Sequence, residues 1–173
     1  LIESPLAPVL MVQKYALWYW QPILGCATFA CWNMLRTMDK LNEGEGNKHR
    51  ISVEVIAETI GVNRQVITGR LRGSRWIKGA FDILNNEGLA KIEAVLQDKD
   101  NPRSAIWWAR VLNSVPFLAP AQVAKLTPTI QERHDRFIRD FSIDTEKWEQ
   151  ITLESLVPGH KQFAECKLAC ARA

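Results

Sequence analysis

Apolar residues recur at helical spacing near the middle of the chain, in two short runs separated by a glycine. The first run follows Ser52, a residue type that caps helices by accepting a hydrogen bond from a backbone N–H of the first turn. Its apolar positions are Val55, Ile56 and Ile60. This spacing predicts a short amphipathic helix that packs one side on a core.

A second helix is predicted after Gly61, because glycine readily adopts the left-handed conformation that ends helices. Asn63 can cap this helix, and its inward side would carry Val66, Ile67 and Leu71. Two helices joined by a tight glycine turn are the helix-turn-helix arrangement.

The second helix and the residues after it form the most basic part of the chain. No acidic residue occurs from Thr59 to Phe81, and this stretch carries five cations. Arginine donates bidentately to phosphate or guanine, glutamine pairs with adenine, and threonine contacts a thymine methyl group. The residues expected here to contact DNA are Arg64, Gln65, Thr68, Arg70, Arg72, Arg75 and Lys78. A solvated basic face is the alternative interpretation.

The residues before this stretch predict an aromatic arm and a central helix. Residues 1–21 contain prolines and clustered Tyr and Trp side chains, which predict an extended arm that either covers its own core or reaches a partner. Residues 22–41 predict the central helix, and residues 42–50 predict a polar loop. The apolar stretch 15–35 is interrupted by polar residues and a proline, so we expect no membrane span.

Two alternating segments later in the chain predict a β-hairpin. Residues 74–88 first predict an added helix that stops at an Asn-Asn-Glu-Gly sequence. Residues 89–97 and 104–113 then alternate apolar and polar positions and are joined by a polar turn. The turn cations Lys99 and Arg103 complete the set of residues expected to contact DNA.

Residues 116–173 predict a helical extension. Pro128 is expected either to kink its first helix or to restart it with Thr127 as the cap. A stripe at heptad-like spacing predicts either a face packed on its own domain or the seam of a homodimer, and consists of Leu126, Ile130, His134, Phe137 and Phe141. His134 is expected to be a hydrogen-bonded core histidine.

The composition is that of one ordinary globular domain. The chain has 173 residues, of which 47% are hydrophobic and 24% charged. The net charge of +3 is small, so the expectation of a nucleic-acid partner rests on local clustering of cations. The sequence contains no Gly-rich phosphate loop, nucleophile elbow, HExxH or paired-carboxylate pattern, so we expect neither enzymatic activity nor a cofactor.

The cysteines Cys26, Cys31, Cys166 and Cys170 lie in helix-like apolar patterns without a CxxC pair. With no secretory signal ahead of them, we expect reduced, buried thiols. A metal site is the alternative, because Cys166 and Cys170 are spaced to share a helix face near His160. We expect no bound metal.

The order of two helices around a glycine turn, at residues 51–71, and a β-hairpin, at residues 89–113, resembles the winged-helix family of DNA-binding domains. The resemblance covers residues 22–113 and extends to bacterial replication initiators, DnaD-like primosomal proteins and transcription regulators. It implies a mainly α fold, in which a winged helix-turn-helix core at residues 22–115 lies between the arm and the C-terminal extension. In a minimal winged helix the recognition helix runs almost directly into the wing, whereas residues 74–88 come between here.

The resemblance implies a cytoplasmic, nucleoid-associated protein that binds double-stranded DNA in bacterial transcription regulation or replication initiation. The alternative is an adaptor subunit of a larger nucleoprotein complex, in which the winged helix and the aromatic arm contact other proteins.

Overall fold

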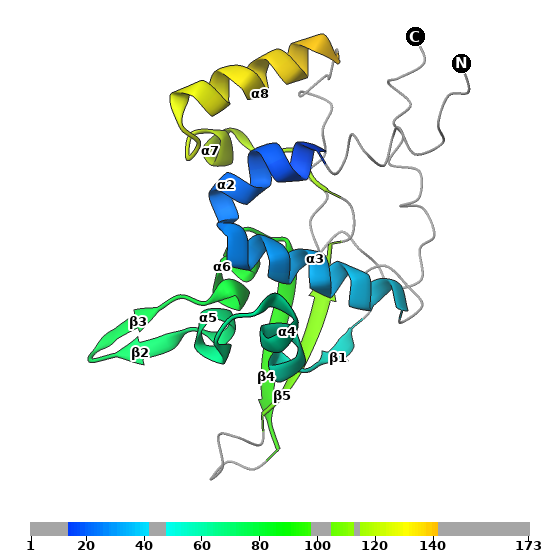
Figure 1. Cartoon of the computed structure of the whole chain (residues 1–173), viewed down its shortest axis with the longest axis vertical. Coiled ribbons are helices and arrows are strands. Elements are labelled where there is room, and N and C mark those ends of the chain that lie inside the picture. Colours follow the sequence, from blue (N-terminus) through cyan, green and yellow to red (C-terminus); the bar gives the residue numbers. More distant parts are fainter. Residues whose placement is uncertain (1–13, 42–47, 98–104, 113–114, 142–173) are drawn as a thin grey trace. The chain divides into compact units, whose positions relative to one another are not determined.

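The chain forms two compact units, which are called here the terminal unit and the central unit. The terminal unit contains residues 14–23 and 115–141, and the central unit contains residues 24–112. The described residues of the expected arm and of the expected C-terminal extension therefore belong to one unit. The computed structural model describes residues 14–41, 48–97, 105–112 and 115–141 (Figure 1).

The central unit contains a three-stranded antiparallel sheet in the order β1-β5-β4 (Figure 1). Strands β4 (Ala90–Leu96) and β5 (Ala105–Val111) pair along their whole lengths. This confirms the predicted hairpin, whose turn at residues 98–103 lies outside the described residues. Strand β1 (His49–Ile51) pairs with the other edge of β5, although a loop was predicted there. The fold is thus helical with a small antiparallel sheet.

Helices α3 (Cys26–Leu41) and α6 (Ala80–Asn86) pack against this sheet, α3 on β5 and α6 on β4. Helices α4 (Val53–Ile60) and α5 (Arg64–Thr68) pack on α3 and on each other. Their contacts enclose one apolar core. Its most buried large side chains are Trp32, Leu35, Ile56, Ile67, Leu84 and Leu89.

The ends of α4 follow the predicted capping signals. The Ser52 hydroxyl accepts a hydrogen bond from the Val55 N–H at 3.3 Å, and Gly61 ends the helix with a φ of 75°. The buried side differs from the prediction in part, because Val53 is buried with Ile56 and Ala57 while Val55 is exposed. Helical spacing alone permits either side, and the packing of α4 on α3 and α5 selects this one.

Helix α5 is shorter than predicted. Asn63 caps it as expected, accepting a hydrogen bond from the Gln65 N–H at 2.9 Å. Gly69 then stops the helix with φ 80° and ψ 171°, a conformation that favours glycine, so the predicted continuation to Leu71 is wrong. Of the predicted inward residues only Ile67 is buried, whereas Leu71 is 67% exposed.

Residues 70–77 form an antiparallel hairpin instead of helix, with strands β2 (Arg70–Arg72) and β3 (Arg75–Ile77). This hairpin, called here the basic ribbon, projects away from the sheet and the helices of the central unit (Figure 1). The added helix predicted within residues 74–88 is confirmed only for α6, because Trp76 and Ile77 belong to β3.

The terminal unit contains η1 (Ala16–Trp20), a π-helical segment, followed by the start of α2 (Gln21–Leu24). The predicted extended arm is therefore wrong for residues 14–21, and residues 1–13 lie outside the described ranges. The predicted central helix is interrupted at Gly25, which has a φ of 77°. Helices α7 (Pro120–Val123) and α8 (Pro128–Asp140) complete the unit, and α8 starts at Pro128, so the proline restarts the helix and does not kink it.

An aromatic cluster forms the core of the terminal unit. Tyr15 Oη lies 2.9 Å from His134 Nε2 and accepts a hydrogen bond from the Leu118 N–H at 3.0 Å. The contact between Tyr15 and the imidazole confirms the predicted hydrogen-bonded core histidine. Burial lowers the pKa of His134, and the neighbouring Asp135 carboxylate only partly offsets this effect.

The predicted stripe on α8 packs largely within this cluster. Leu126 and His134 are buried, and the Phe137 ring lies 5.8 Å from that of Tyr19. The stripe thus follows the interpretation of a face packed on its own unit, and only Phe141 at its end is exposed. In the described ranges, no helix combines the length and the apolar character needed to cross a membrane.

Candidate nucleic-acid interface

The basic ribbon places three arginines on one face. Arg72 pairs directly with Arg75 across the ribbon, and Arg70 lies two residues before Arg72 on the same strand. Side chains of directly opposed residues and of residues two apart lie on the same face of a two-stranded sheet. The opposite face carries Leu71 and Trp76, which form the next cross-strand pair.

The pairing of like charges in the ribbon is unfavourable by itself. Two cations directly opposite each other in a sheet repel, and the ribbon contains no carboxylate that could compensate them. All six strand residues except Ile77 are exposed, so solvent reduces this repulsion without removing it. An anion bound between the guanidinium groups would convert the repulsion into attraction.

A two-residue turn joins the strands of the ribbon. Gly73 occupies its first position with a φ of 61°, and Ser74 follows. Turns of this length match the twist of hairpin strands when their first residue has a positive φ. The tip is therefore narrow and carries no bulky side chain.

The root of the ribbon is held by a close crossing of two glycines. A Cβ atom added to Gly79 would overlap the backbone of residues 67–69, which shows how closely the two chain segments approach. The Asp82 carboxylate of α6 fixes the same place, because its Oδ2 accepts hydrogen bonds from the Gly79 N–H and the Trp76 Nε1–H, both at 2.9 Å. The Asp82 carboxylate is therefore engaged in anchoring the root.

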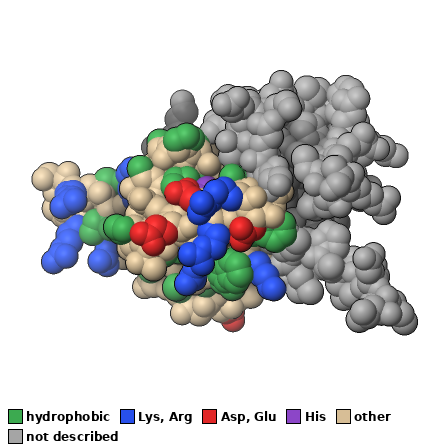
Figure 2. Space-filling view, turned by 90° about the horizontal axis from the view of Figure 1, so that it is seen from above, with side chains coloured by type: hydrophobic (Ala, Val, Ile, Leu, Met, Phe, Trp, Pro, Cys, Tyr) green, Lys and Arg blue, Asp and Glu red, His purple; other side chains and the backbone are tan. Residues whose placement is uncertain are grey.

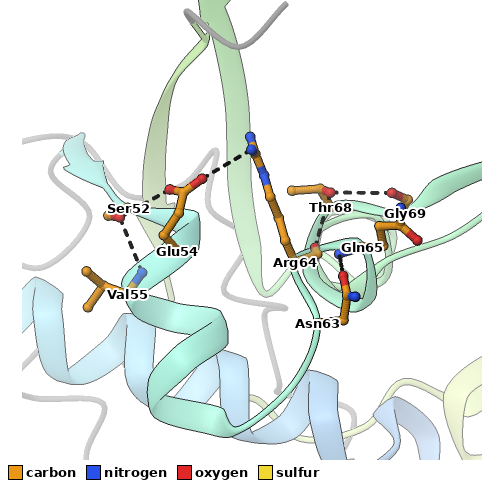
Figure 3. A network of polar contacts seen from close by, with 8 residues as sticks. All are labelled: Ser52, Glu54, Val55, Asn63, Arg64, Gln65, Thr68 and Gly69. Atoms are coloured by element: carbon orange, nitrogen blue, oxygen red, sulfur yellow. Dashed lines mark hydrogen bonds and ion pairs between the residues drawn. The ribbon is translucent and has the colours of Figure 1, made fainter.

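The residues of α5 have other partners (Figure 3). Arg64 extends toward α4, where its Nη1 lies 3.2 Å from Glu54 Oε1. The Thr68 hydroxyl lies 3.2 Å from the Arg64 carbonyl oxygen and 3.3 Å from that of Gly69, so it donates back to the backbone. Arg64 and Thr68, which were predicted to contact DNA, thus bond to other groups of the protein.

Lys and Arg side chains gather on the projecting part of the central unit, where Figure 1 draws the ribbon (Figure 2). Lys78 follows β3 directly and is exposed, as is Gln65 on α5. The remaining predicted contacts, Lys99 and Arg103, lie outside the described residues. Of the predicted set, the structure gathers Arg70, Arg72 and Arg75 on one face and leaves Arg64 in an ion pair.

The interpretation of the sequence missed Trp76 as a surface residue and Leu71 as its neighbour. Trp76 is 51% exposed although its indole N–H is fixed to Asp82. A signal existed, because the alternating triplets RLR and RWI flank Gly-Ser, a dipeptide that favours two-residue hairpin turns. The helical spacing of Ile67 and Leu71 had favoured a helix instead.

The cysteines and histidines described by the structure offer no metal centre. No group of three or more His, Cys, Asp or Glu side chains within these residues is placed to hold a metal ion. Cys31 is buried as predicted, and burial raises the pKa of its thiol to about 12, whereas Cys26 is exposed, contrary to the prediction. Cys166 and Cys170 lie outside the described residues.

Comparisons with protein-family models, with curated proteins and with solved structures find no match to this chain. The resemblance to winged-helix proteins therefore rests on the order of the elements alone.

Proposed function

We propose that the chain is a non-enzymatic protein that binds double-stranded DNA and that its main contact with the duplex is the basic ribbon. The observation that carries this proposal is the gathering of Arg70, Arg72 and Arg75 on one face without a carboxylate among them. Arginine suits phosphate and guanine because its planar guanidinium donates two parallel hydrogen bonds. The major groove is wide enough to admit a two-stranded ribbon.

The order of the elements supports a modified winged helix. The helix that runs almost directly into the β4–β5 hairpin is α6, because only residues 87–89 separate Asn86 from Ala90. In a winged helix this place belongs to the recognition helix. Yet α6 contains no Lys or Arg, and its Asp82 is oriented toward the ribbon. The basic ribbon, inserted between α5 and α6, is better suited to contact DNA than either helix.

The proposal is tested by titrating a fluorescently labelled duplex of about two helical turns with the full chain and measuring anisotropy. The test variant replaces Arg70, Arg72 and Arg75 by Gln. The matched control replaces Lys91, Lys125 and Arg139 by Gln, which are exposed cations outside the ribbon. Both variants lose three positive charges, so a nonspecific charge effect would weaken them equally.

We expect the ribbon variant to lose nearly all duplex binding and the control variant to keep most of it. Three phosphate contacts by the ribbon give a slope of about −2.7 in a plot of log affinity against log salt concentration. These contacts should therefore make the wild-type affinity fall roughly 40-fold from 50 to 200 mM salt. Equal binding by the ribbon variant and the wild type contradicts the proposal. Equal losses of affinity in the two variants would show that binding depends on the net charge of the chain and not on the ribbon.

A further inference from the structure

A groove on the terminal unit has no part in the proposed contact with DNA. Its volume is about 370 Å³, and it runs between the helical segment at residues 14–20 and α8. The residues lining it are Lys14, Trp18, Tyr19, Arg133, Arg136, Phe137, Asp140 and Phe141.

The floor of the groove is aromatic and preformed. Trp18 and Phe141 are 41% and 45% exposed, and the Phe137 ring lies 4.6 Å from that of Phe141. The Tyr19 hydroxyl donates to the Arg133 carbonyl oxygen at 3.2 Å, which fixes the floor to α8. Large exposed aromatic side chains held in place are the residues that contribute most to protein interfaces.

The rim of the groove is basic. Lys14, Arg133 and Arg136 are all exposed, and among the described residues Asp140 is the one carboxylate that lines the groove. Within the described part of the chain, none of these three cations forms an ion pair. A ligand that brings carboxylates to the rim would therefore gain attraction without displacing an existing partner.

The orientation of the rings favours a protein ligand over nucleobases. The ring planes of Tyr19 and Phe137 are 64° apart, and those of Trp18 and Tyr19 are 85° apart. Bases of a single strand stack on exposed aromatic faces in succession. The planes of Phe137 and Phe141 are likewise 42° apart, so neighbouring rings of the floor are not parallel and offer gaps between side chains instead. Apolar side chains of a helix fit such gaps.

We propose that this groove binds an acidic amphipathic helix of a partner protein. Apolar side chains at i, i+3 and i+7 of that helix enter the floor beside Trp18 and Phe141, and its carboxylates contact Arg133, Arg136 and Lys14. This is the helix-in-groove mode of recognition, in which a third helix lies across two others. The proposal does not depend on DNA binding.

The probe is a fluorescein-labelled helical peptide of 18 residues, a length that we choose to span α8, with Leu or Trp at the anchor positions and Glu at most others. Anisotropy titrations compare the full wild-type chain with Trp18→Ala and with the double variant Arg133→Glu, Arg136→Glu. Trp76→Ala and the double variant Lys91→Glu, Lys125→Glu are the controls, with the same chemical changes elsewhere. Circular dichroism checks that each variant is folded.

Saturable binding by the wild type and the controls, weakened at least ten-fold by each groove variant, supports the proposal. Absence of saturable binding overturns it, as does equal binding of a peptide whose anchors are Ser. Binding of oligo(dT) that depends on the same residues would reassign the groove to single-stranded DNA. Residues 144–156 of the chain are themselves acidic, and peptide binding seen only after Trp148→Ala would reassign the groove to them.

Discussion

Replacing Gly79 by Ala tests the close crossing at the root of the ribbon. Gly79 has φ −93° and ψ 179°, an extended conformation that any residue adopts. From the backbone dihedrals alone, alanine should therefore be neutral or stabilise the fold by about 0.4–1 kcal/mol, because it restricts the unfolded chain. The atoms around Gly79 predict the opposite effect, a loss of fold stability.

The added Cβ atom would lie 2.5 Å from the Ile67 carbonyl oxygen and 2.7 Å from the Thr68 carbonyl carbon, and closer still to the Gly69 nitrogen. All three atoms belong to the backbone, so no side-chain rotation relieves the overlap. Overpacking in a tight interior costs about 1–3 kcal/mol, and we expect the upper end here. A loss of about 3 kcal/mol corresponds to a decrease in Tm of roughly 12–24 °C for a domain of about 60–100 residues, the size range of the central unit.

Thermal and urea unfolding followed by circular dichroism measure this loss. Gly73→Ala is the matched control, because its φ of 61° disfavours alanine while no atom lies within 4 Å of the added Cβ. Its expected cost is about 1–2 kcal/mol, from the left-handed conformation alone. A Gly79→Ala protein as stable as the wild type, or more stable than Gly73→Ala, would refute the inferred crossing.

Three further measurements address the ribbon and the terminal unit. Arg72→Ala should reduce the salt slope of duplex binding by about 0.9, which salt titrations of affinity measure, and an unchanged slope would exclude a phosphate contact. Asp82→Ala should cost about 1–2 kcal/mol in urea unfolding because two donors lose their acceptor, while Asp82→Asn should cost less. The lowered pKa of His134 stabilises the fold above its unfolded pKa of about 6.5, and this stability is lost as the pH falls. His134→Gln should therefore flatten the decrease in unfolding free energy between pH 7.5 and 5, whereas an equally steep decrease would contradict this.

The helix ends of the central unit could be predicted because capping is local. Ser52, Gly61 and Asn63 each act through the backbone within four residues, so the sequence contains the whole interaction. The buried side of α4 could not be predicted in the same way. Val53 and Val55 are both apolar and both lie in the first turn, and the packing of α4 on other elements, α3 and α5 among them, determines which of them is buried.

The structure of the aromatic segment before α2 also could not be predicted locally, because it depends on residues far away in the sequence. The prolines and clustered aromatic residues suggested an extended arm, yet the hydroxyl groups of Tyr15 and Tyr19 bond to residues more than 100 positions later, on α8 and just before α7. Only the pairing of two segments distant in sequence satisfies these groups. His134 was placed correctly because a histidine on an apolar stripe requires a buried hydrogen-bond partner, whichever residue supplies it.

The conformation of residues 70–75 determines how many of their arginines can face a duplex at the same time. On a helix, successive residues are about 100° apart, so Arg70 and Arg72 would lie on nearly opposite sides, about 200° apart, and only one of them could face a duplex. In the ribbon both lie on one face with Arg75. Single Ala variants at positions 70 and 72 should therefore weaken duplex binding by similar factors, within about three-fold, in anisotropy titrations. A strong effect at one position and none at the other would return these residues to the helical interpretation and remove the geometric basis for contact through the ribbon.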